Sequence, residues 1–400
     1  MIKIFIYNSM YLCYINFFMI KNTAEFYSVL LKKFQYSPTS KQHKLLQLLS
    51  DFTFSIDKDN LFLLKGYAGT GKTTSIGAFV NSLSLTGRKS VLLAPTGRAA
   101  KVLSKYSKKL ASTIHRKIYW IRTNKSGNTF ITLKENTHTN TIFIVDEASM
   151  IAENSEKGFG NRSLLNDVIE YVYHGIDCKL ILIGDTAQLP PVHLDVSPAL
   201  DEEILERNFN KQIIWKELTQ VVRQEENSMI LNNATLLRNK IAKNDYSFPT
   251  IETNNEVVRI NTGEELQEAL ESAYSNNGIN NTSVLCRSNK RANLYNQQIR
   301  TKIRWQENEI SAGDMLMVVR NNYHWLDENS KAGFIANGDI VQVTKIKETI
   351  DRYGFRFARA SVKMVDYPQE EEMELILLLD TLTSQPPTIS YESYQKFYKE

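Results

Sequence analysis

Nine residues from Gly66 to Thr74, GYAGTGKTT, have the types and spacing of a phosphate-binding loop. They match the pattern G-x-x-x-x-G-K-[ST], in which backbone N–H groups of a glycine-rich turn face the phosphates. Lys72 would place its ammonium on the β- and γ-phosphates, and the hydroxyl of Thr73 would bind Mg²⁺. The other loop residues expected at the nucleotide are Gly66, Ala68, Gly69, Thr70, Gly71 and Thr74. The stretch therefore predicts a site for ATP and Mg²⁺.

Two adjacent carboxylates follow a second apolar run, in the stretch IFIVDEASM. Asp146 would reach the coordination shell of Mg²⁺, and Glu147 is the candidate base for the attacking water. The alternative is an ordinary acidic strand end that faces solvent. Two adjacent acids suit a hydrolase better than a passive nucleotide-binding switch.

A lone glutamine lies in the stretch LIGDTAQLPPV, at residues 182–192. An apolar strand is expected to end at Gly-Asp, and Pro190 and Pro191 stiffen the chain after Gln188. Gln188 follows the next apolar strand after the one that ends at Asp146. Its amide is therefore expected to reach the attacking water or the γ-phosphate. The alternative is a rigid loop with an exposed amide.

Apolar strands that alternate with helices are expected to position these residues. The strands are predicted at residues 61–66, 90–95, 141–147 and 179–185. The helices are predicted at residues 23–34 and 41–52, after Lys72, around 97–109 and near 163–174. Apolar strands followed by helices indicate an α/β fold whose parallel sheet is covered on both faces.

Three further segments depart from this alternation. Residues 117–134 read as two alternating runs around NKSGN and predict an inserted β-hairpin. A helix near 226–241, a strand at 282–288 and a helix at 289–303 predict a second α/β domain. After residue 337 short strands follow without intervening helices, which predicts a small β module, and a further helix is expected to begin near the C-terminal YESYQKFYKE.

The charge of the chain is distributed unevenly. The net charge is +4 over 400 residues, but residues 60–134 contain fourteen Lys or Arg and no Asp or Glu. Scattered surface lysines would explain any one of these residues. A stretch of this length without an acid favours a polyanionic partner.

The cysteines and the N-terminus narrow the class of protein. Cys13, Cys178 and Cys286 are far apart and match no metal or redox spacing, so apolar packing and a cytoplasmic location are expected. Polar residues interrupt the apolar first 18 residues, and no cleavage site follows. These residues are expected to be an extension outside the fold, and no membrane association is expected.

Taken in order, the motifs resemble those of superfamily one helicases of the RecD-like and Dda-like branch. The resemblance runs from about Pro38 to Val343. Its segments are SPTSKQHKLL, the phosphate loop, APTGRAAKVL, ASTIHR, VDEASM, GDTAQLPPV, LTQVVRQ, VLCRSNKRANLYNQQIR and GDMLMVVRNNY with NGDIVQV. One such segment alone would be weak evidence, whereas the ordered set is specific.

The resemblance implies two RecA-like motor domains with parallel sheets. The expected divisions are an N-terminal extension and helix (1–36), a first RecA-like ATPase domain (37–220) with the hairpin at about 117–134, an incomplete second RecA-like domain (221–337) and a small SH3/OB-like β module (338–400). ATP would bind in the cleft between the two motor domains.

The resemblance also implies roles for individual residues. Gln42 would read adenine, and Arg223 would reach the γ-phosphate from the second domain; the alternative for Arg223 is a structural salt bridge. The residues expected to contact single-stranded DNA are Thr96, Arg98, Thr113, His115, Pro190 and Asn289. His115 could instead be a core histidine, and Arg98 could simply be solvated. Trp120 and Phe130 are candidates for a strand-separating pin, with packing of the hairpin as the alternative.

The implied function is an ATP-dependent DNA helicase or translocase, 5′-to-3′ on single-stranded DNA. Its expected partners are single-stranded and forked duplex DNA, with single-strand-binding, repair or recombination proteins as further candidates, and the chain is expected to act as a monomer. The segments T-x-H-K-x-Q-G and T-R that end the motor in this family are not found before Glu400, which predicts a truncated chain that hydrolyses ATP poorly. The alternatives are a nucleotide-gated module that binds single-stranded nucleic acid and a P-loop switch that acts on proteins.

Overall fold

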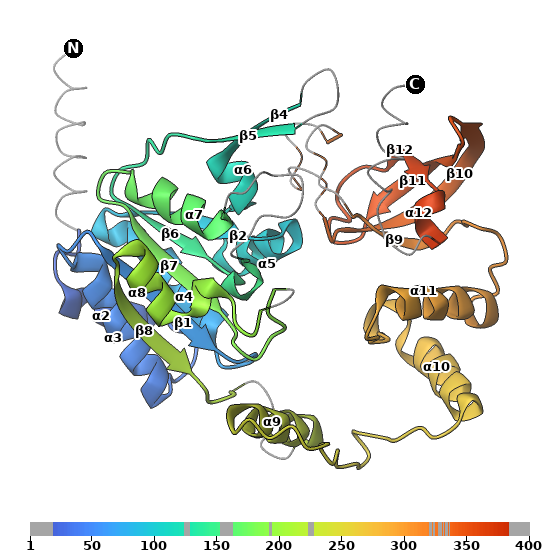
Figure 1. The fold of residues 1–400 in the computed structure, drawn as a ribbon, viewed down its shortest axis with the longest axis horizontal. Helices are drawn as coiled ribbons and strands as arrows, with labels where there is room; N and C mark the ends of the chain where they lie inside the picture. Colours follow the sequence, from blue (N-terminus) through green and yellow to red (C-terminus); the bar gives the residue numbers. More distant parts are fainter. Residues whose placement is uncertain are drawn as a thin grey trace, which may run out of the picture. The chain divides into compact units, whose positions relative to one another are not determined.

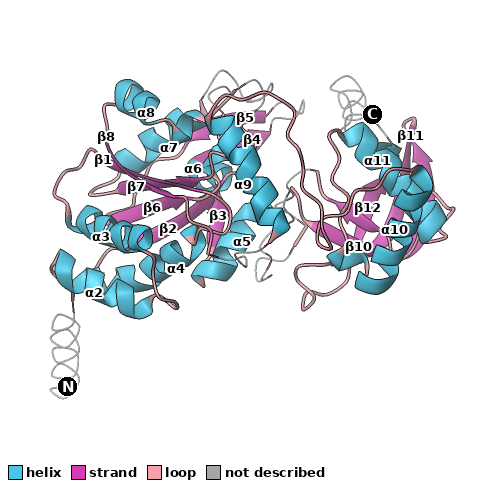
Figure 2. Cartoon of the chain, turned by 90° about the horizontal axis from the view of Figure 1, so that it is seen from below, coloured by secondary structure: helices cyan, strands magenta, loops and turns pink. Residues whose placement is uncertain are grey.

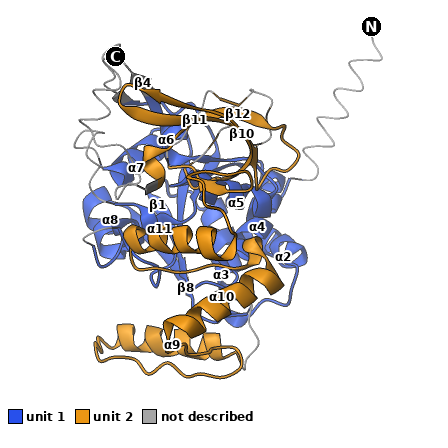
Figure 3. Ribbon diagram, turned by 90° about the vertical axis from the view of Figure 1, so that its right-hand side faces the viewer, with its two compact units in different colours: residues 1–124, 128–226 blue, residues 125–127, 227–400 orange. Residues whose placement is uncertain are grey.

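The computed structural model describes residues 19–123, 129–152, 163–191, 194–222, 228–319 and 337–383, together with residues 322, 325, 326, 330, 332 and 335. The chain divides into two compact units, residues 1–124 with 128–226, and residues 125–127 with 227–400 (Figure 3). The predicted extension at residues 1–18 lies outside the described residues.

Unit 1 is built on a six-stranded parallel sheet with the order β3-β2-β6-β7-β1-β8. The strands are β1 (Asn60–Gly66), β2 (Lys89–Ala94), β3 (Ala111–Thr113), β6 (Thr141–Val145), β7 (Lys179–Gly184) and β8 (Gln212–Leu218). The expectation of an α/β fold with a large parallel sheet is confirmed. β8 was not predicted from the sequence; it is an edge strand that pairs with β1 over its whole length.

Helices cover both faces of this sheet (Figures 1 and 2). They are α2 (Thr23–Lys33), α3 (Ser40–Phe54), α4 (Lys72–Leu83), α5 (Gly97–Ser107), α6 (Ile114–Ile118), α7 (Leu164–Tyr173) and α8 (Glu202–Phe209), with short turns η1 (Ser84–Thr86), η2 (Ala148–Met150) and η3 (Pro198–Leu200).

Successive side chains of β1 point to opposite faces of the sheet and pack into two separate hydrophobic cores. Phe62 joins the cluster with α2, α3 and α4, whereas Leu63 joins the cluster with α6, α7 and α8. Phe26 and Leu30 of α2 are fully buried, so this helix belongs to the core of unit 1.

The predicted hairpin is present as a separate two-stranded sheet. It pairs β4 (Tyr119–Thr123) with β5 (Thr129–Leu133) in antiparallel register. The hydroxyl of Tyr119 donates to Oδ2 of Asp167 on α7 over 2.6 Å, and both residues are buried. This contact anchors the base of the hairpin to the body of unit 1.

Unit 2 combines separate helices with an antiparallel sheet. The helices are α9 (Met229–Ala242), α10 (Gly263–Asn277), η4 (Ile279–Asn281), α11 (Asn289–Gln298), a π-helical turn η5 (Ile299–Ile303) and α12 (Asp380–Thr383). The sheet has the order β12-β11-β10-β9, from β9 (Met315–Met317), β10 (Ile340–Arg352), β11 (Phe355–Met364) and β12 (Met373–Leu378). Strands are thus found after residue 337 as expected, while their assignment to an SH3/OB-like module stays a prediction.

The prediction of a strand at residues 282–288 is wrong. These residues are described and form no strand, and Leu285 is 96% exposed. An apolar parallel strand is stable only when neighbouring strands pair with it and helices bury its faces, and no described strand pairs with this segment. In the described part of residues 228–337 no parallel sheet forms, so the second RecA-like domain stays a prediction.

No helix in the described ranges combines the length and the apolar character that crossing a bilayer requires.

Candidate functional site

The phosphate loop joins β1 to α4 and depends on glycine at two positions. Gly69 and Gly71 have φ values of +79° and +87°, in the left-handed region that favours glycine. A Cβ on Gly71 would lie 2.4 Å from Nε2 of Gln42. The loop therefore needs glycine for its backbone conformation at both positions, and at Gly71 also for its close packing against α3.

Gln42 is buried against this loop, and the N-terminal cap of α3 holds its side chain in place. Thr39 and Gln42 form a capping box at the start of α3, in which the Thr39 amide donates to Oε1 of Gln42 over 2.8 Å. Nε2 of Gln42 donates to the carbonyl of Thr70 over 3.0 Å. The structure thus brings Gln42 to the phosphate loop, and its role in reading adenine stays a prediction.

Lys72 lies at the start of α4 among groups that would surround a phosphate. Its ammonium donates to the carbonyls of Gly66 and Tyr67. Burial lowers the pKa of Lys72, and the nearby carboxylates of Asp185, Asp146 and Glu147 act in the opposite direction. A partly buried ammonium close to carboxylates at the start of a helix suits a phosphate bound with a cation.

Asp146 and Glu147 follow β6 directly and are held at its end. The Asp146 amide donates to the carbonyl of Leu93 on β2, and the Glu147 amide donates to Oδ1 of Asp146, both over 2.9 Å. Burial raises the pKa of both carboxyls. Glu147 has a φ of +55°, which turns the chain sharply into η2.

The residues expected to bind Mg²⁺ share one small pocket. Thr73 and Asp146 both line it, together with Lys72. A hydroxyl and a carboxylate are the oxygen ligands that Mg²⁺ prefers, with water and phosphate oxygens completing the shell. These two oxygen groups therefore fit Mg²⁺, whereas apolar side chains line much of the rest of the pocket.

Gln188 lies in a turn that follows β7. The turn is closed by hydrogen bonds from the Gln188 amide to the Asp185 carbonyl (3.3 Å) and from the Ala187 amide to Oδ1 of Asp185 (2.8 Å). Gln188 is exposed, and its Oε1 accepts from Oγ of Ser149 over 3.2 Å. Burial raises the pKa of the Glu147 carboxyl, and the nearby Gln188 side chain acts on it in the opposite direction. The structure thus places Gln188 near the candidate base Glu147, and its contact with the attacking water or the γ-phosphate stays a prediction.

Two residues of this site were missed by the sequence analysis. Asp185 is buried, closes the turn of Gln188 and acts on Lys72; its position directly after an apolar strand was a signal that could have found it. Ser149 donates from Oγ to Oε1 of Gln188 over 3.2 Å. Serine is too common in turns for its type to have indicated this contact.

Among the residues expected to contact DNA, the two threonines also cap helices. Thr96 accepts from the Ala99 amide at the start of α5 (3.2 Å), and Thr113 accepts from the Arg116 amide at the start of α6 (3.3 Å). Thr113 is buried, so capping explains its residue type. Thr96 follows β2 and Thr113 ends β3, and the carboxyl ends of these neighbouring parallel strands lie at the same edge of the sheet as the phosphate loop.

The other expected DNA contacts are differently placed. Arg98 is exposed on α5, and the His115 ring is partly buried 5.6 Å from that of Tyr119. Pro190 is partly exposed on the loop after Gln188. Asn289 is exposed at the start of α11 in unit 2. Contacts of all four with DNA stay predictions.

The hairpin presents one of its two candidate pin residues. Trp120 is 58% exposed, and the ammonium of Lys134 lies 4.7 Å from its ring centroid. Trp120 pairs with Thr132 towards the base of the hairpin, whereas Phe130 pairs with Arg122 towards the turn. The side chain of Phe130 and the whole of Arg223 lie outside the described residues.

Parts of this chain are similar in sequence to known proteins. A family model described as the AAA domain matches residues 51–262, more than half of the chain. The ATP-dependent DNA helicase dda of Enterobacteria phage T4 is 33% identical over 187 residues, which cover 46% of this chain and 39% of that helicase. The ATP-dependent RecD2 DNA helicase of Deinococcus radiodurans is 33% identical over 132 residues, which cover 33% of this chain and 16% of that helicase.

A solved Pif1 helicase from Bacteroides, in complex with ADP-AlF3 and ssDNA, is also similar. It matches with a TM-score of 0.43 and 16% identity over 84% of this chain and 73% of its own. The chain thus spans less than half of the length of the two curated helicases it matches. On the family match and these relatives, the chain belongs to the AAA-domain family and, within it, to the RecD-like and Dda-like helicases that its motifs resemble.

Proposed function

We propose that the chain is an ATP-driven motor that moves along single-stranded DNA in the 5′-to-3′ direction and separates strands. One observation carries this proposal: the turn after β7 holds Gln188 against η2, the turn that follows Glu147, through the hydrogen bond from Ser149, and continues directly into the exposed Leu189 and then Pro190. A group expected to sense the phosphate thus lies on the same exposed loop as Leu189 and Pro190. Coupling of hydrolysis to a polymer needs a connection of this kind.

The residues of the site divide the reaction between them. The loop amides and Lys72 bind and orient the phosphates, and Thr73 with Asp146 would hold Mg²⁺, which supplies charge stabilisation at the β- and γ-phosphates when bound. Glu147 accepts a proton from the attacking water, and the raised pKa of its carboxyl makes it a stronger base. Gln188 orients that water through its amide.

The DNA assignment rests on charge and on the relatives. Residues 60–134 carry fourteen basic and no acidic residues, and they include the carboxyl ends of β2 and β3. Basic side chains bind phosphates without sequence preference and with strong salt dependence. We extend the proposal to a monomer in the cytoplasm that acts on single-stranded or forked DNA during replication, recombination or repair.

The first test measures ATP hydrolysis with and without single-stranded DNA. The wild type should be stimulated by DNA, and Glu147→Gln should lower kcat by about a hundredfold or more. Gln188→Ala should lower the DNA-stimulated kcat about tenfold while the affinity for a fluorescent ATP analogue stays within about twofold. A large loss of ATP affinity in Gln188→Ala would contradict the sensing role.

The second test compares duplexes with 5′ and 3′ single-stranded tails. The motor should separate only the 5′-tailed substrate, in an ATP-dependent manner. Tight, nucleotide-dependent and salt-sensitive binding of single strands without strand separation would instead identify a nucleotide-gated binding module. Binding that barely changes with salt would contradict both DNA assignments.

A further inference from the structure

A short stretch of chain at the end of unit 1 is held against the phosphate loop at both of its ends. This exit segment, residues 218–222, begins at the last residue of β8 and ends just before the boundary to unit 2. At its start, the Tyr67 amide donates to the Leu218 carbonyl over 3.3 Å. At its end, the Val222 amide donates to the Gly69 carbonyl over 3.0 Å. The connection to unit 2 therefore begins at the nucleotide site.

Close packing fixes the exit segment in this position. A Cβ on Gly66 would lie 2.8 Å from the carbonyl oxygen of Leu218 and 3.1 Å from its Cβ, so a larger residue would push the segment away. Nζ of Lys41 on α3 donates to Oγ1 of Thr219 over 2.5 Å. The segment is thus attached both to the loop and to α3, and the Val222 amide meets the loop from a fixed backbone.

The hydrogen bond from Val222 holds a peptide unit that its glycine leaves free to turn. Gly69 has a φ of +79°, and glycine adopts left-handed and right-handed conformations about equally readily. In a trans peptide unit the C=O and N–H groups point to opposite sides. With the Gly69 carbonyl bound to Val222, the Thr70 amide points the other way, where it donates to the Tyr67 carbonyl over 3.3 Å.

The next peptide unit of the loop is held in the same manner. The Thr70 carbonyl accepts from Nε2 of Gln42 over 3.0 Å, so the amide of Gly71 is directed away from α3. Gly71 is the N-cap of α4, and the first amides of a helix have no partner within it. Amides of this kind bind phosphates. Two consecutive peptide units are therefore fixed from outside the loop, one by the exit segment and one by α3.

We propose that Val222 is a positioning residue for nucleotide binding, whose backbone amide sets the phosphate loop and couples it to the connection with unit 2. This inference rests on the proposed function, because it concerns the nucleotide site of that function. Without the amide, the peptide unit between Gly69 and Thr70 can rotate, and part of the binding free energy is consumed in ordering the loop. Nucleotide binding and formation of this hydrogen bond therefore favour each other.

Proline at position 222 removes the donor, because proline has no N–H. Val222→Pro should raise the Kd for ADP, measured by titration calorimetry, about five- to tenfold, which corresponds to one hydrogen bond. ADP is the probe because it lacks the γ-phosphate that the next residue, Arg223, is expected to contact. The Kd for an ATP analogue that resists hydrolysis should rise by the same factor. A loss confined to the analogue would assign the effect to Arg223 and overturn the proposal.

Two further variants separate the amide from other effects of the substitution. Val222→Ala keeps the amide and shortens a side chain that is 49% exposed, so it should restore the affinity for ADP to within about twofold of the wild type. Gln220→Pro places the same ring at another exposed residue of the exit segment, and should also bind ADP within about twofold of the wild type. A loss in either variant as large as that in Val222→Pro would overturn the proposal.

Hydrogen exchange of the Val222 amide tests the coupling without hydrolysis. Coupling between two equilibria is reciprocal, so saturating ADP should slow the exchange of this amide in the wild type about five- to tenfold, the factor lost in Val222→Pro. The measurement is mass spectrometry with fragmentation that resolves single amides. Exchange that ADP leaves unchanged would contradict the coupling.

These measurements keep the inference distinct from the proposed function. If the wild type shows no DNA-stimulated hydrolysis, but Val222→Pro binds ADP weakly and ADP slows the exchange, the proposed function is wrong and the positioning role stands. If DNA-stimulated hydrolysis is present, but Val222→Pro binds ADP as the wild type does, the inference is wrong. A wild type that binds neither ADP nor the analogue would overturn both.

Discussion

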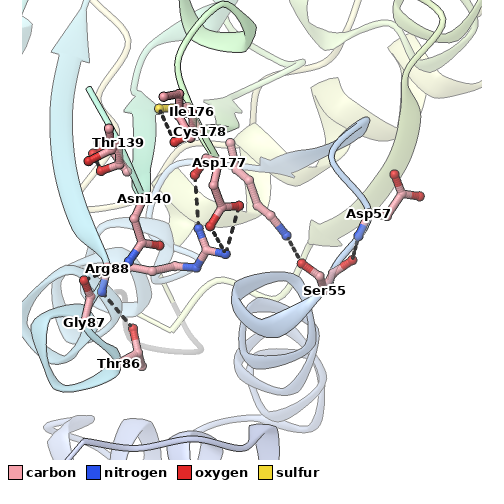
Figure 4. Close-up of polar contacts among 12 residues, drawn as sticks. Ser55, Asp57, Thr86, Gly87, Arg88, Thr139, Asn140, Ile176, Asp177 and Cys178 are labelled. Carbon is pink, nitrogen blue, oxygen red and sulfur yellow. Dashed lines mark hydrogen bonds and ion pairs between the residues drawn. The ribbon is translucent and has the colours of Figure 1, made fainter. Parts of the chain in front are cut away.

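Lys179 is a buried charge whose titration should be visible in the stability of the protein. It begins β7, is 1% exposed, and donates from Nζ to the carbonyls of Phe52 (2.9 Å) and Ser55 (2.6 Å) at the end of α3. Figure 4 shows Ser55 with the neighbouring Arg88–Asp177 pair, whose closest N–O distance is 3.1 Å. The carbonyls at the carboxyl end of a helix stabilise a cation, so the ammonium is tolerated there.

The direction of the pH effect follows from the pKa of Lys179. Burial lowers this pKa to about 8, with a smaller contribution from Arg88. An unfolded lysine has a pKa of about 10.4. Between these values the unfolded chain binds more protons, so the free energy of unfolding should rise with pH. At 1.36 kcal/mol per pKa unit the total rise is about 3 kcal/mol at most.

The assay is urea unfolding followed by circular dichroism at pH 7, 8, 9 and 10. The free energy of unfolding of the wild type minus that of Lys179→Met should increase by about 2–3 kcal/mol from pH 8 to 10, because the variant has no group to titrate. Lys58→Met removes an exposed lysine just after the same helix and is the control. A difference between wild type and Lys179→Met that is flat over this range, or that falls, would refute the reasoning.

Three further predictions concern the phosphate loop and the hairpin. In Gly71→Ala the new Cβ would lie 2.4 Å from Nε2 of Gln42, at a residue whose φ is +87°. This variant should weaken the binding of a fluorescent ATP analogue at least about tenfold. The control is Gly77→Ala, whose Cβ would lie an ordinary 3.5 Å from its nearest neighbour and which should bind the analogue as the wild type does. Tyr119→Phe removes the 2.6 Å hydrogen bond to Asp167 and should lower the free energy of unfolding by about 1.5–3 kcal/mol, measured by urea titration; an unchanged midpoint would contradict this anchor. Trp120→Ala should reduce unwinding of a forked duplex more than single-strand-stimulated ATP hydrolysis, and equal losses would count against the pin.

The nucleotide site was largely predictable because its parts are local or follow strand ends. The phosphate loop is contiguous, and its glycines, Lys72 and Thr73 are readable without any knowledge of the fold. Asp146 and Gln188 each follow an apolar run, and parallel strands end at one edge of a sheet, so their proximity followed from the α/β pattern. The structure brings both towards the same few groups.

The second unit shows where local pattern was insufficient. Residues 282–288 have the apolar and β-branched composition of a strand, but the pairing partners that would stabilise one lie elsewhere in a chain and leave no local signal. The edge strand β8 was missed for the opposite reason. Its half-exposed Trp215 and interspersed charges hide a strand that β1 pairs with along its whole length.

The sequence by itself determined the chemistry of the phosphate loop, the parallel sheet of unit 1 and the hairpin, since these depend on residue types at short spacing. Only the tertiary structure decided the strand order, the burial of Lys179 beneath α3 and the contact between Ser149 and Gln188. Ser149 and Gln188 lie 39 residues apart, and Lys179 and Phe52 lie 127 apart. Which such side chains meet depends on how the strands are ordered and how the helices pack on them, and spacing along the chain carries no record of either.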